Sequence, residues 1–278
     1  MAKRKRLLGF YIPNIALMLL FLAPFVWTLS TSLKTPDKVT TIPPELMPRP
    51  FSLGYYNQLW TFDDGSFRHY FLNSTCNSTY VVIAVVAVSS LAGYGFACLD
   101  IPFKELWFVL LLAAMMIPFQ SLLIPLFINM RKMGLLSTRL SLILIYTTFE
   151  LPFSTFMMRN AFESVPRGMR EAALLDGASE MRVFRDVMLP VVWPGIVTIA
   201  IHSFYRTWND FLIAFVFTTT EEMKTLTVGL RNLSIGPYSL DFGLLSAGSI
   251  VSCLPVMVLF AVLQRYFVAG ITGGSVKQ

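Results

Sequence analysis

Long apolar runs constrain this chain more than any other feature of its sequence. A helix needs about 20 residues to cross the hydrocarbon core of a bilayer, and six apolar stretches have about that length: 12–30, 80–99, 106–129, 140–158, 191–217 and 244–267. Only 14% of the residues are charged, whereas a soluble domain carries about a quarter. The sequence therefore predicts an all-α integral membrane protein with one domain, 1–278, of six transmembrane helices.

The distribution of basic residues predicts the orientation. Four of them, Lys3 to Arg6, precede the first apolar run, and positive charge beside the first span favours the cytoplasmic side. A signal peptide is the alternative, but the run is long and lacks an A-x-A exit. We therefore expect both termini in the cytoplasm and residues 31–79 as an ordered extracytoplasmic loop. Orientation also explains the net charge of +6 better than nucleic-acid binding, because no basic stripe with interleaved aromatics is present.

A polar interval, residues 161–190, separates the fourth and fifth apolar runs. Val165-Pro166 suits a helix start, good helix formers run from Glu171 to Leu175, and Gly177 suits a turn. A second amphipathic piece follows and is expected to stop at Leu189-Pro190. It would turn these residues toward apolar partners: Ala178, Met181, Val183, Phe184, Val187 and Met188. We expect a helix, a turn and a helix on the cytoplasmic side.

This interval resembles the EAA loop of ABC importer permeases. In that signature EAA, three residues, Gly, nine residues and a branched aliphatic-x-Leu-Pro follow in order, and this chain has them at that spacing: Glu171, Ala172, Ala173, Asp176, Gly177, Ala178, Val187, Leu189 and Pro190. An ordinary interfacial helix would need amphipathicity but not this spacing. The resemblance implies the type I ABC importer permease fold, with these residues docking into a cleft on a separate ATPase subunit.

Shorter motifs along nearly the whole chain resemble the carbohydrate-uptake branch of these permeases. They are Pro43-Pro44-Glu45, Ser89 to Tyr94, Met116-Ile117-Pro118, Gln120, Ile124-Pro125-Leu126, Gly134-Leu135, Trp208-Asn209-Asp210, Thr225 to Leu230 and Gln264 to Phe267. The resemblance implies a sugar substrate delivered by an extracytoplasmic solute-binding protein. It also implies a sister permease, forming a heterodimer, and two ATPase subunits in the cell membrane.

The chain carries no motif for chemistry of its own. ATP and Mg would be bound by the ATPase subunit, because no G-x-x-x-x-G-K-[ST] phosphate cradle occurs here. Two histidines without a paired nucleophile and base give no catalytic site, and Cys76, Cys98 and Cys253 are too scattered for a metal site or a disulfide framework. Two alternatives stay open: an ABC permease for a non-sugar solute, and an ion-coupled secondary transporter with Glu150, His202 and Asp210 as a proton relay.

Polar residues inside the predicted spans need partners, because ionisable groups are costly in a membrane. His202, Arg206 and Asp210 recur at i, i+4 and i+8, so one face of the fifth span is polar. One hypothesis makes this face the border of the substrate pathway, formed by Glu150, Tyr205, Trp208, Asn209 and Asp210. The other is an Arg206–Asp210–Glu150 network that only holds spans together.

Overall fold

The computed structural model describes residues 2–233 and 241–273, with side chains for 10–233 and 241–263, and contains no strand in these ranges. The side chains of the basic cluster Lys3 to Arg6 and of the tail Gln264 to Phe267 lie outside the described residues. The chain forms two units. Unit 1 comprises Met1–His69 and Val228–Pro255, and unit 2 comprises Tyr70–Thr227 and Val256–Gln278.

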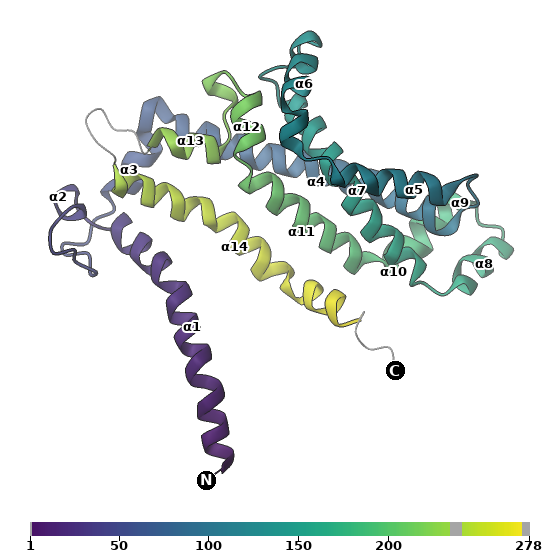
Figure 1. The fold of residues 1–278 in the computed structure, drawn as a ribbon, viewed down its shortest axis with the longest axis horizontal. Helices are drawn as coiled ribbons and strands as arrows, with labels where there is room; N and C mark the ends of the chain where they lie inside the picture. Colours follow the sequence, from purple (N-terminus) through teal and green to yellow (C-terminus); the bar gives the residue numbers. More distant parts are fainter. Residues whose placement is uncertain (1, 234–240, 274–278) are drawn as a thin grey trace. The chain divides into compact units, whose positions relative to one another are not determined.

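The α-helices follow one another along the chain as Figure 1 shows: α1 (Ala2–Ser32), α2 (Pro36–Val39), α3 (Gly54–Thr61), α4 (Ser66–Cys98), α5 (Lys104–Ala113), α6 (Phe119–Lys132), α7 (Arg139–Glu163), α8 (Arg167–Leu175), α9 (Glu180–Arg182), α10 (Leu189–Val191), α11 (Trp193–Asn209), α12 (Leu212–Phe217), α13 (Leu226–Leu233) and α14 (Phe242–Gly273). Short turns of other helix types are η1 (Phe62–Gly65), η2 (Ala114–Met116), the π-helical η3 (Val183–Met188) and η4 (Glu221–Met223).

Four helical segments in the described part of the chain are long and apolar enough to cross a bilayer: Phe10–Ser32, Gly54–Cys98, Arg139–Glu163 and Phe242–Leu263. Two bent pairs raise the number to six if each is one span. The first is Lys104–Met116 with Phe119–Lys132, bent by 96°, and the second is Glu180–Val191 with Trp193–Asn209, bent by 78°. The structure thus agrees with the predicted all-α fold class.

Two of the predicted spans are broken rather than continuous. In the third, predicted over 106–129, Ile117 is extended (φ −80°, ψ 114°), because a residue before proline is pushed away from helical angles. The fifth, predicted over 191–217, has its own break at Asp210 (φ −69°, ψ 134°), so that α11 ends at Asn209 and α12 is a separate helix. A hydropathy pattern reports the length of an apolar run and does not show where the backbone breaks within it.

The segment 31–79, predicted as an ordered extracytoplasmic loop, is partly helical. It holds α2, α3 and the beginning of α4, which starts at Ser66 instead of residue 80. The added turns are polar yet buried, and Asn73 and Asn77 are 7% and 2% exposed. A search for apolar runs misses a helix of this kind, because the side chains that it buries are polar.

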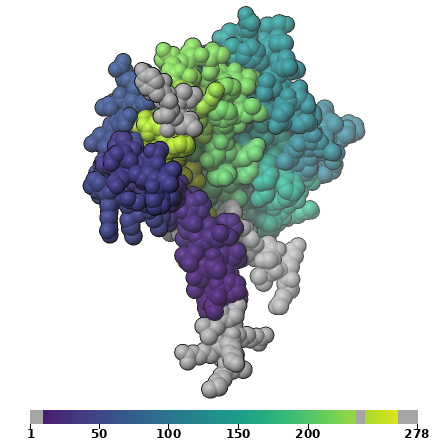
Figure 2. All heavy atoms as spheres, turned by 60° about the vertical axis from the view of Figure 1, so that its left-hand side comes forward, coloured from purple at the N-terminus to yellow at the C-terminus, as the bar shows by residue number. Residues whose placement is uncertain are grey.

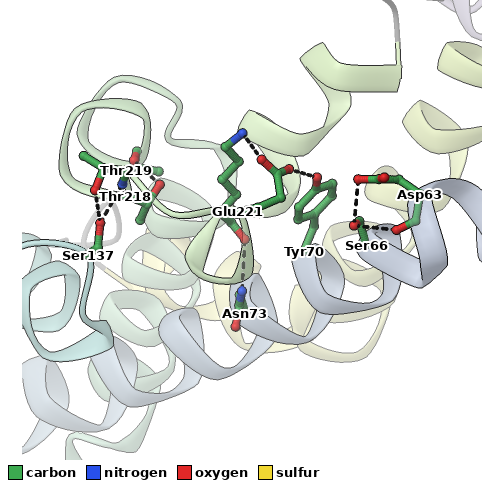
Figure 3. A network of polar contacts seen from close by, with 10 residues as sticks. Asp63, Ser66, Tyr70, Asn73, Ser137, Thr218, Thr219 and Glu221 are labelled. Atoms are coloured by element: carbon green, nitrogen blue, oxygen red, sulfur yellow. Dashed lines mark hydrogen bonds and ion pairs between the residues drawn. The ribbon is translucent and has the colours of Figure 1, made fainter.

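Polar contacts in unit 2 hold the connection after α12 against this part of α4 (Figure 3). Tyr70 donates a hydrogen bond to Glu221, and the Asn73 amide nitrogen lies 2.6 Å from the carbonyl oxygen of Glu222 and 3.1 Å from that of Lys224. Ser137, before α7, bonds with Thr219. These bonds position the connection that follows the break at Asp210.

In unit 1, α1 exposes most of its apolar side chains from Phe10 to Trp27, and Figure 2 shows the purple helix extending away from the loop that follows it. Such a surface suits contact with lipid. Further along, Ser32 Oγ lies 2.9 Å from Tyr56 Oη of α3. A Cβ on Gly243 of α14 would lie 2.0 Å from Tyr55 Cζ, so a glycine is needed where α3 meets α14.

Unit 2 has two apolar clusters. In one, Val81 and Val85 of α4 meet Leu142 and Ile145 of α7 and Phe217 of α12. The other joins the end of α4 to α7, η3 and α11 through these buried residues: Tyr94, Met158, Phe162, Val183, Phe184, Met188, Ile196 and Ile199. Helices α4 and α7 therefore form the frame to which the other helices of this unit attach.

Gly93 permits the close crossing of α4 and α7. A Cβ there would lie 2.6 Å from Met158 Cβ and 2.9 Å from the backbone nitrogen of Arg159. We expect Gly93→Ala to destabilise the purified complex by about 1–3 kcal/mol through overpacking, measured by thermal unfolding in detergent. Gly95→Ala is the matched control, because its Cβ would meet Ile101 at an ordinary 3.6 Å. Equal stability of the two variants would contradict the close packing.

Candidate functional site

Helix α8 lies at one end of unit 2 (Figure 1) and carries the first part of the EAA signature. It starts at Arg167, directly after Pro166, and ends at Leu175, close to the predicted bounds. Gly177 has φ +82°, a left-handed conformation that glycine adopts without strain. The Gly177 N–H bonds to the Leu174 carbonyl (3.0 Å) and the Ala178 N–H to the Ala173 carbonyl (3.1 Å). This Schellman closure fixes the direction in which the chain leaves α8.

The signature divides into an inner and an outer set. Ala173, Ala178 and Leu189 are half-buried and pack against the cluster around Tyr94 and Met158. The exposed members are Glu171, Ala172, Asp176, Gly177 and Pro190. One set thus attaches the motif to the rest of unit 2, and the other set lies on the surface.

Leu175 is the outer residue that sequence reasoning missed. Its side chain is 88% exposed, and its i+3 and i+4 spacing from Ala172 and Glu171 puts all three on one face of α8. A helical wheel of α8 could have found this leucine on the side opposite the packed residues. A large apolar side chain next to an acid and a small alanine is suited to a groove on another protein.

The second amphipathic piece differs from its prediction in two respects. Val183, Phe184 and Met188 are buried as expected, but Met181 is 64% exposed. Leu189-Pro190 does not end the helix either. The π-helical η3 runs directly into α10, and the break comes at Val192 (φ −87°, ψ 10°), ahead of Pro194.

Charged side chains surround α8. Arg170 donates from Nε to Glu180 Oε1 at 2.9 Å, and Tyr94 of α4 donates to the same oxygen. Burial alone would raise the pKa of Glu180, but the hydrogen bonds from Arg170 and Tyr94 outweigh it and hold that pKa below its usual range. Beside this group is a polar pocket of about 550 Å³, whose lining includes Cys98, Lys104 and Glu171.

Glu150 of α7 meets the polar face of α11. It is 5% exposed, and its Oε1 accepts a hydrogen bond from Arg206 Nε at 3.2 Å. His202 Nδ1 lies 2.9 Å from the other oxygen, and the His202 ring lies 4.3 Å from that of Phe153. The predicted pairing of Glu150 with Arg206 is therefore formed.

Asp210 forms hydrogen bonds other than those expected in an Arg206–Asp210–Glu150 network. Its Oδ1 accepts hydrogen bonds from Tyr146 Oη (2.8 Å) and from the N–H groups of Ile213 (2.9 Å) and Ala214 (3.2 Å). Its carbonyl accepts one from Thr227 Oγ1 at 2.6 Å. The carboxylate thus satisfies the free N–H groups at the start of α12, where the fifth span is broken.

A pocket of about 380 Å³ lies along this face. Its lining includes four of the five residues predicted for the substrate pathway: Glu150, Tyr205, Asn209 and Asp210. The fifth, Trp208, is 2% exposed, stacks on Phe204 (centroids 5.5 Å apart) and meets Phe71 edge-on (5.7 Å). Successive residues of a helix point about 100° apart, so Trp208 turns into the protein where Asn209 turns to the pocket. The prediction that Trp208 stacks on a sugar is not supported by this geometry.

The fold matches two solved structures over nearly their whole length. One is a bacterial ABC transporter involved in the import of the acidic polysaccharide alginate, with a TM-score of 0.86, 22% identity and coverage of 96% of this chain and 98% of that one. The other is the bacterial alginate ABC transporter in complex with an alginate pentasaccharide-bound periplasmic protein, with a TM-score of 0.69, 14% identity and coverage of 95% and 94%. The architecture is that of an ABC importer permease.

The sequence also matches a family model, the binding-protein-dependent transport system inner membrane component, over residues 89–273. The chain belongs to this family. It is a multi-pass permease subunit of an importer that works with a binding protein, and not an enzyme. This confirms the resemblance that the EAA signature carried.

Three relatives match most of the chain. The diacetylchitobiose uptake system permease protein NgcG of Streptomyces coelicolor is 33% identical over 92% of this chain and 84% of its own length. The sulfoquinovosyl glycerol transport system permease protein SmoH of Agrobacterium fabrum is 34% identical over 92% and 89%. The trehalose transport system permease protein SugB of Mycobacterium tuberculosis is 34% identical over 92% and 92%. An ion-coupled secondary transporter is thereby disfavoured.

The Asp210 cap can be tested separately from transport. We expect Asp210→Ala to destabilise the purified complex by about 0.5–2 kcal/mol, the usual cost of a lost helix cap, in thermal unfolding. Asn209→Ala is the neighbouring control. Its amide bonds to the Tyr205 carbonyl, so a change within about 0.5 kcal/mol is expected. Unchanged stability of Asp210→Ala, together with weakened substrate binding, would show that Asp210 serves the pathway and not the fold.

Proposed function

We propose that this permease imports a sugar or an oligosaccharide, and that the pocket beside α11 is its part of the substrate pathway. The relatives support the substrate class, because diacetylchitobiose, sulfoquinovosyl glycerol and trehalose all contain sugar rings. The lining of the pocket carries the proposal for this chain. It combines two carboxylates, a guanidinium, an amide and aromatic rings in one place.

Each of these groups suits a polyhydroxylated ring. Glu150 offers acceptor oxygens, and Arg206, whose side chain is 65% exposed, offers donors beside them. Tyr205 is 54% exposed and presents an aromatic face for the apolar side of a sugar. Arg206 is paired with Glu150, and the second carboxylate, Asp210, accepts hydrogen bonds from the protein itself. Charges that are already engaged in this way favour a substrate recognised through hydroxyl groups. An ABC permease for a non-sugar solute is the second candidate, and it would not need this combination.

The coupling residues lie on and around α8. In this proposal the outer set, Glu171, Ala172, Asp176, Gly177 and Pro190, contacts the ATPase subunit, while Ala173, Ala178 and Leu189 carry the force into the permease. Two ATPase subunits hold ATP and Mg, and a sister permease completes the pathway as a heterodimer. ATP drives transport by binding the two states of the complex with different affinity. The α8 end and both termini face the cytoplasm, opposite the solute-binding protein.

The substrate pocket predicts a specific transport defect. In proteoliposomes with the sister permease, ATPase and binding protein, Tyr205→Ala and Asn209→Ala should each weaken uptake of a labelled sugar by about tenfold, equivalent to about 1.4 kcal/mol. Trehalose and diacetylchitobiose are suitable first substrates, with an amino acid as the non-sugar comparison. Tyr80→Ala, an exposed tyrosine on α4, is the control. Uptake of the amino acid alone would refute the sugar assignment.

If the exposed face of α8 binds the ATPase, substitutions on that face should weaken the binding. Leu175→Asp and Glu171→Arg should each reduce the ATPase recovered with the affinity-purified permease by about tenfold or more, because a buried interface anchor contributes about 2 kcal/mol or more. Met133→Asp is the control, since Met133 is 63% exposed and follows α6, away from α8. Full recovery of the ATPase with both α8 variants would mean that the docking site lies elsewhere.

A further inference from the structure

Tyr94 of α4 lies outside the EAA signature and contacts three segments, α7, η3 and α9. Its ring is 4% exposed and packs against Phe162 of α7 (centroids 5.4 Å apart) and Phe184 of η3 (5.1 Å). Its hydroxyl donates a hydrogen bond to Glu180, the first residue of α9. A hydroxyl inside an apolar cluster needs such a partner, because leaving it unpaired is costly.

Glu180 is shared between Tyr94 and the docking helix. Arg170 of α8 donates to Oε1 of Glu180 at 2.9 Å, and Tyr94 donates to the same atom. The covalent path from α8 to α9 runs through the turn at Gly177. The Arg170–Glu180 ion pair bridges this turn, so that α8 and α9 are held as one body with a charge-assisted hydrogen bond.

Next to these bonds, the ends of α4 and α8 are separated by a polar pocket. It holds about 550 Å³ and is lined by Cys98, the last residue of α4, by Asp100 just after it, and by Arg167 and Glu171 on α8. Ala173 and Ala178 pack against the cluster around Tyr94, but no apolar packing fills this space between the two helices. The hydrogen bonds from Arg170 to Glu180 and from Tyr94 to Glu180 connect α8 to α4 beside this pocket.

We propose that Arg170, Glu180 and Tyr94 form a coupling link that makes α4 move with α8. The inference rests on the proposed docking of α8 to the ATPase and adds the route by which that movement reaches the second span. The three side chains are positioning residues, because they act on the pathway through α4. Without the link, only the packing of Ala173 and Ala178 against the cluster around Tyr94 joins α8 to α4, and each ATP hydrolysed produces a smaller movement of the spans. Spatial proximity alone does not establish such a route, so the coupling between α8 and α4 must be measured.

The sharpest test is Tyr94→Phe, which keeps the ring packing and removes the hydroxyl. In proteoliposomes with the sister permease, ATPase and binding protein, the measured quantity is labelled sugar taken up per ATP hydrolysed. We expect this ratio to fall about fivefold or more, the lower range of usual coupling free energies, with a normal amount of assembled complex. Glu180→Gln should lower it too. Asp186→Asn is the matched control, since it breaks an exposed ion pair with Arg185 (2.7 Å) on the same segment.

A charge reversal provides the second measurement. Arg170→Glu and Glu180→Arg should each lower the ratio, and the double variant should recover part of it. The link is refuted if Tyr94→Phe leaves sugar per ATP at the wild-type value, or if its uptake falls only in proportion to lost assembly. Failure of the docking proposal appears elsewhere, as full ATPase recovery with Leu175→Asp and Glu171→Arg. Tyr94→Phe keeps the ATPase bound in either case, so the two results are distinguishable.

Discussion

Inside a bilayer no water is available to pair with a free backbone N–H or C=O, so every interruption of a helix must be satisfied by the protein itself. This requirement shapes unit 2. At the end of α11 the interruption is closed by the Asp210 carboxylate, which accepts the N–H groups of Ile213 and Ala214 and the Tyr146 hydroxyl. The pocket beside α11 lies at this point. A break in the helix therefore provides both polar groups and open space in one place.

The EAA signature in unit 2 is likewise explained by packing and backbone geometry. The EAA signature uses alanines where a helix must lie close to the cluster around Tyr94 and Met158, and a glycine where the chain must turn with φ +82°. Packing and backbone geometry thus explain Ala173, Ala178 and Gly177, while Glu171, Ala172 and Leu175 are exposed. One short motif therefore has a packed side and an exposed side, and the two sides constrain the spacing of its residues.

The sequence predicted the helical class, the family and the helix-turn-helix of residues 161–190, because apolar length and motif spacing depend on local residues. It did not predict that α4 begins at Ser66, since a buried asparagine such as Asn73 looks like a loop residue until its partner Glu222 is known. Trp208 was placed in the pathway for a similar reason: a polar neighbour on each side does not reveal which way a ring points. The exposure of Leu175 and the role of Tyr94 depend on tertiary contacts, which a single sequence does not show.

The exposure of Leu175 has a consequence for the newly made subunit. In the proposed docking, the ATPase covers a leucine that is 88% exposed in the permease alone. A permease made in excess of the ATPase would keep this side chain uncovered, and unassembled copies are the ones that cellular quality control removes. Under that proposal, the residue that binds the partner also distinguishes assembled from unassembled copies of the permease.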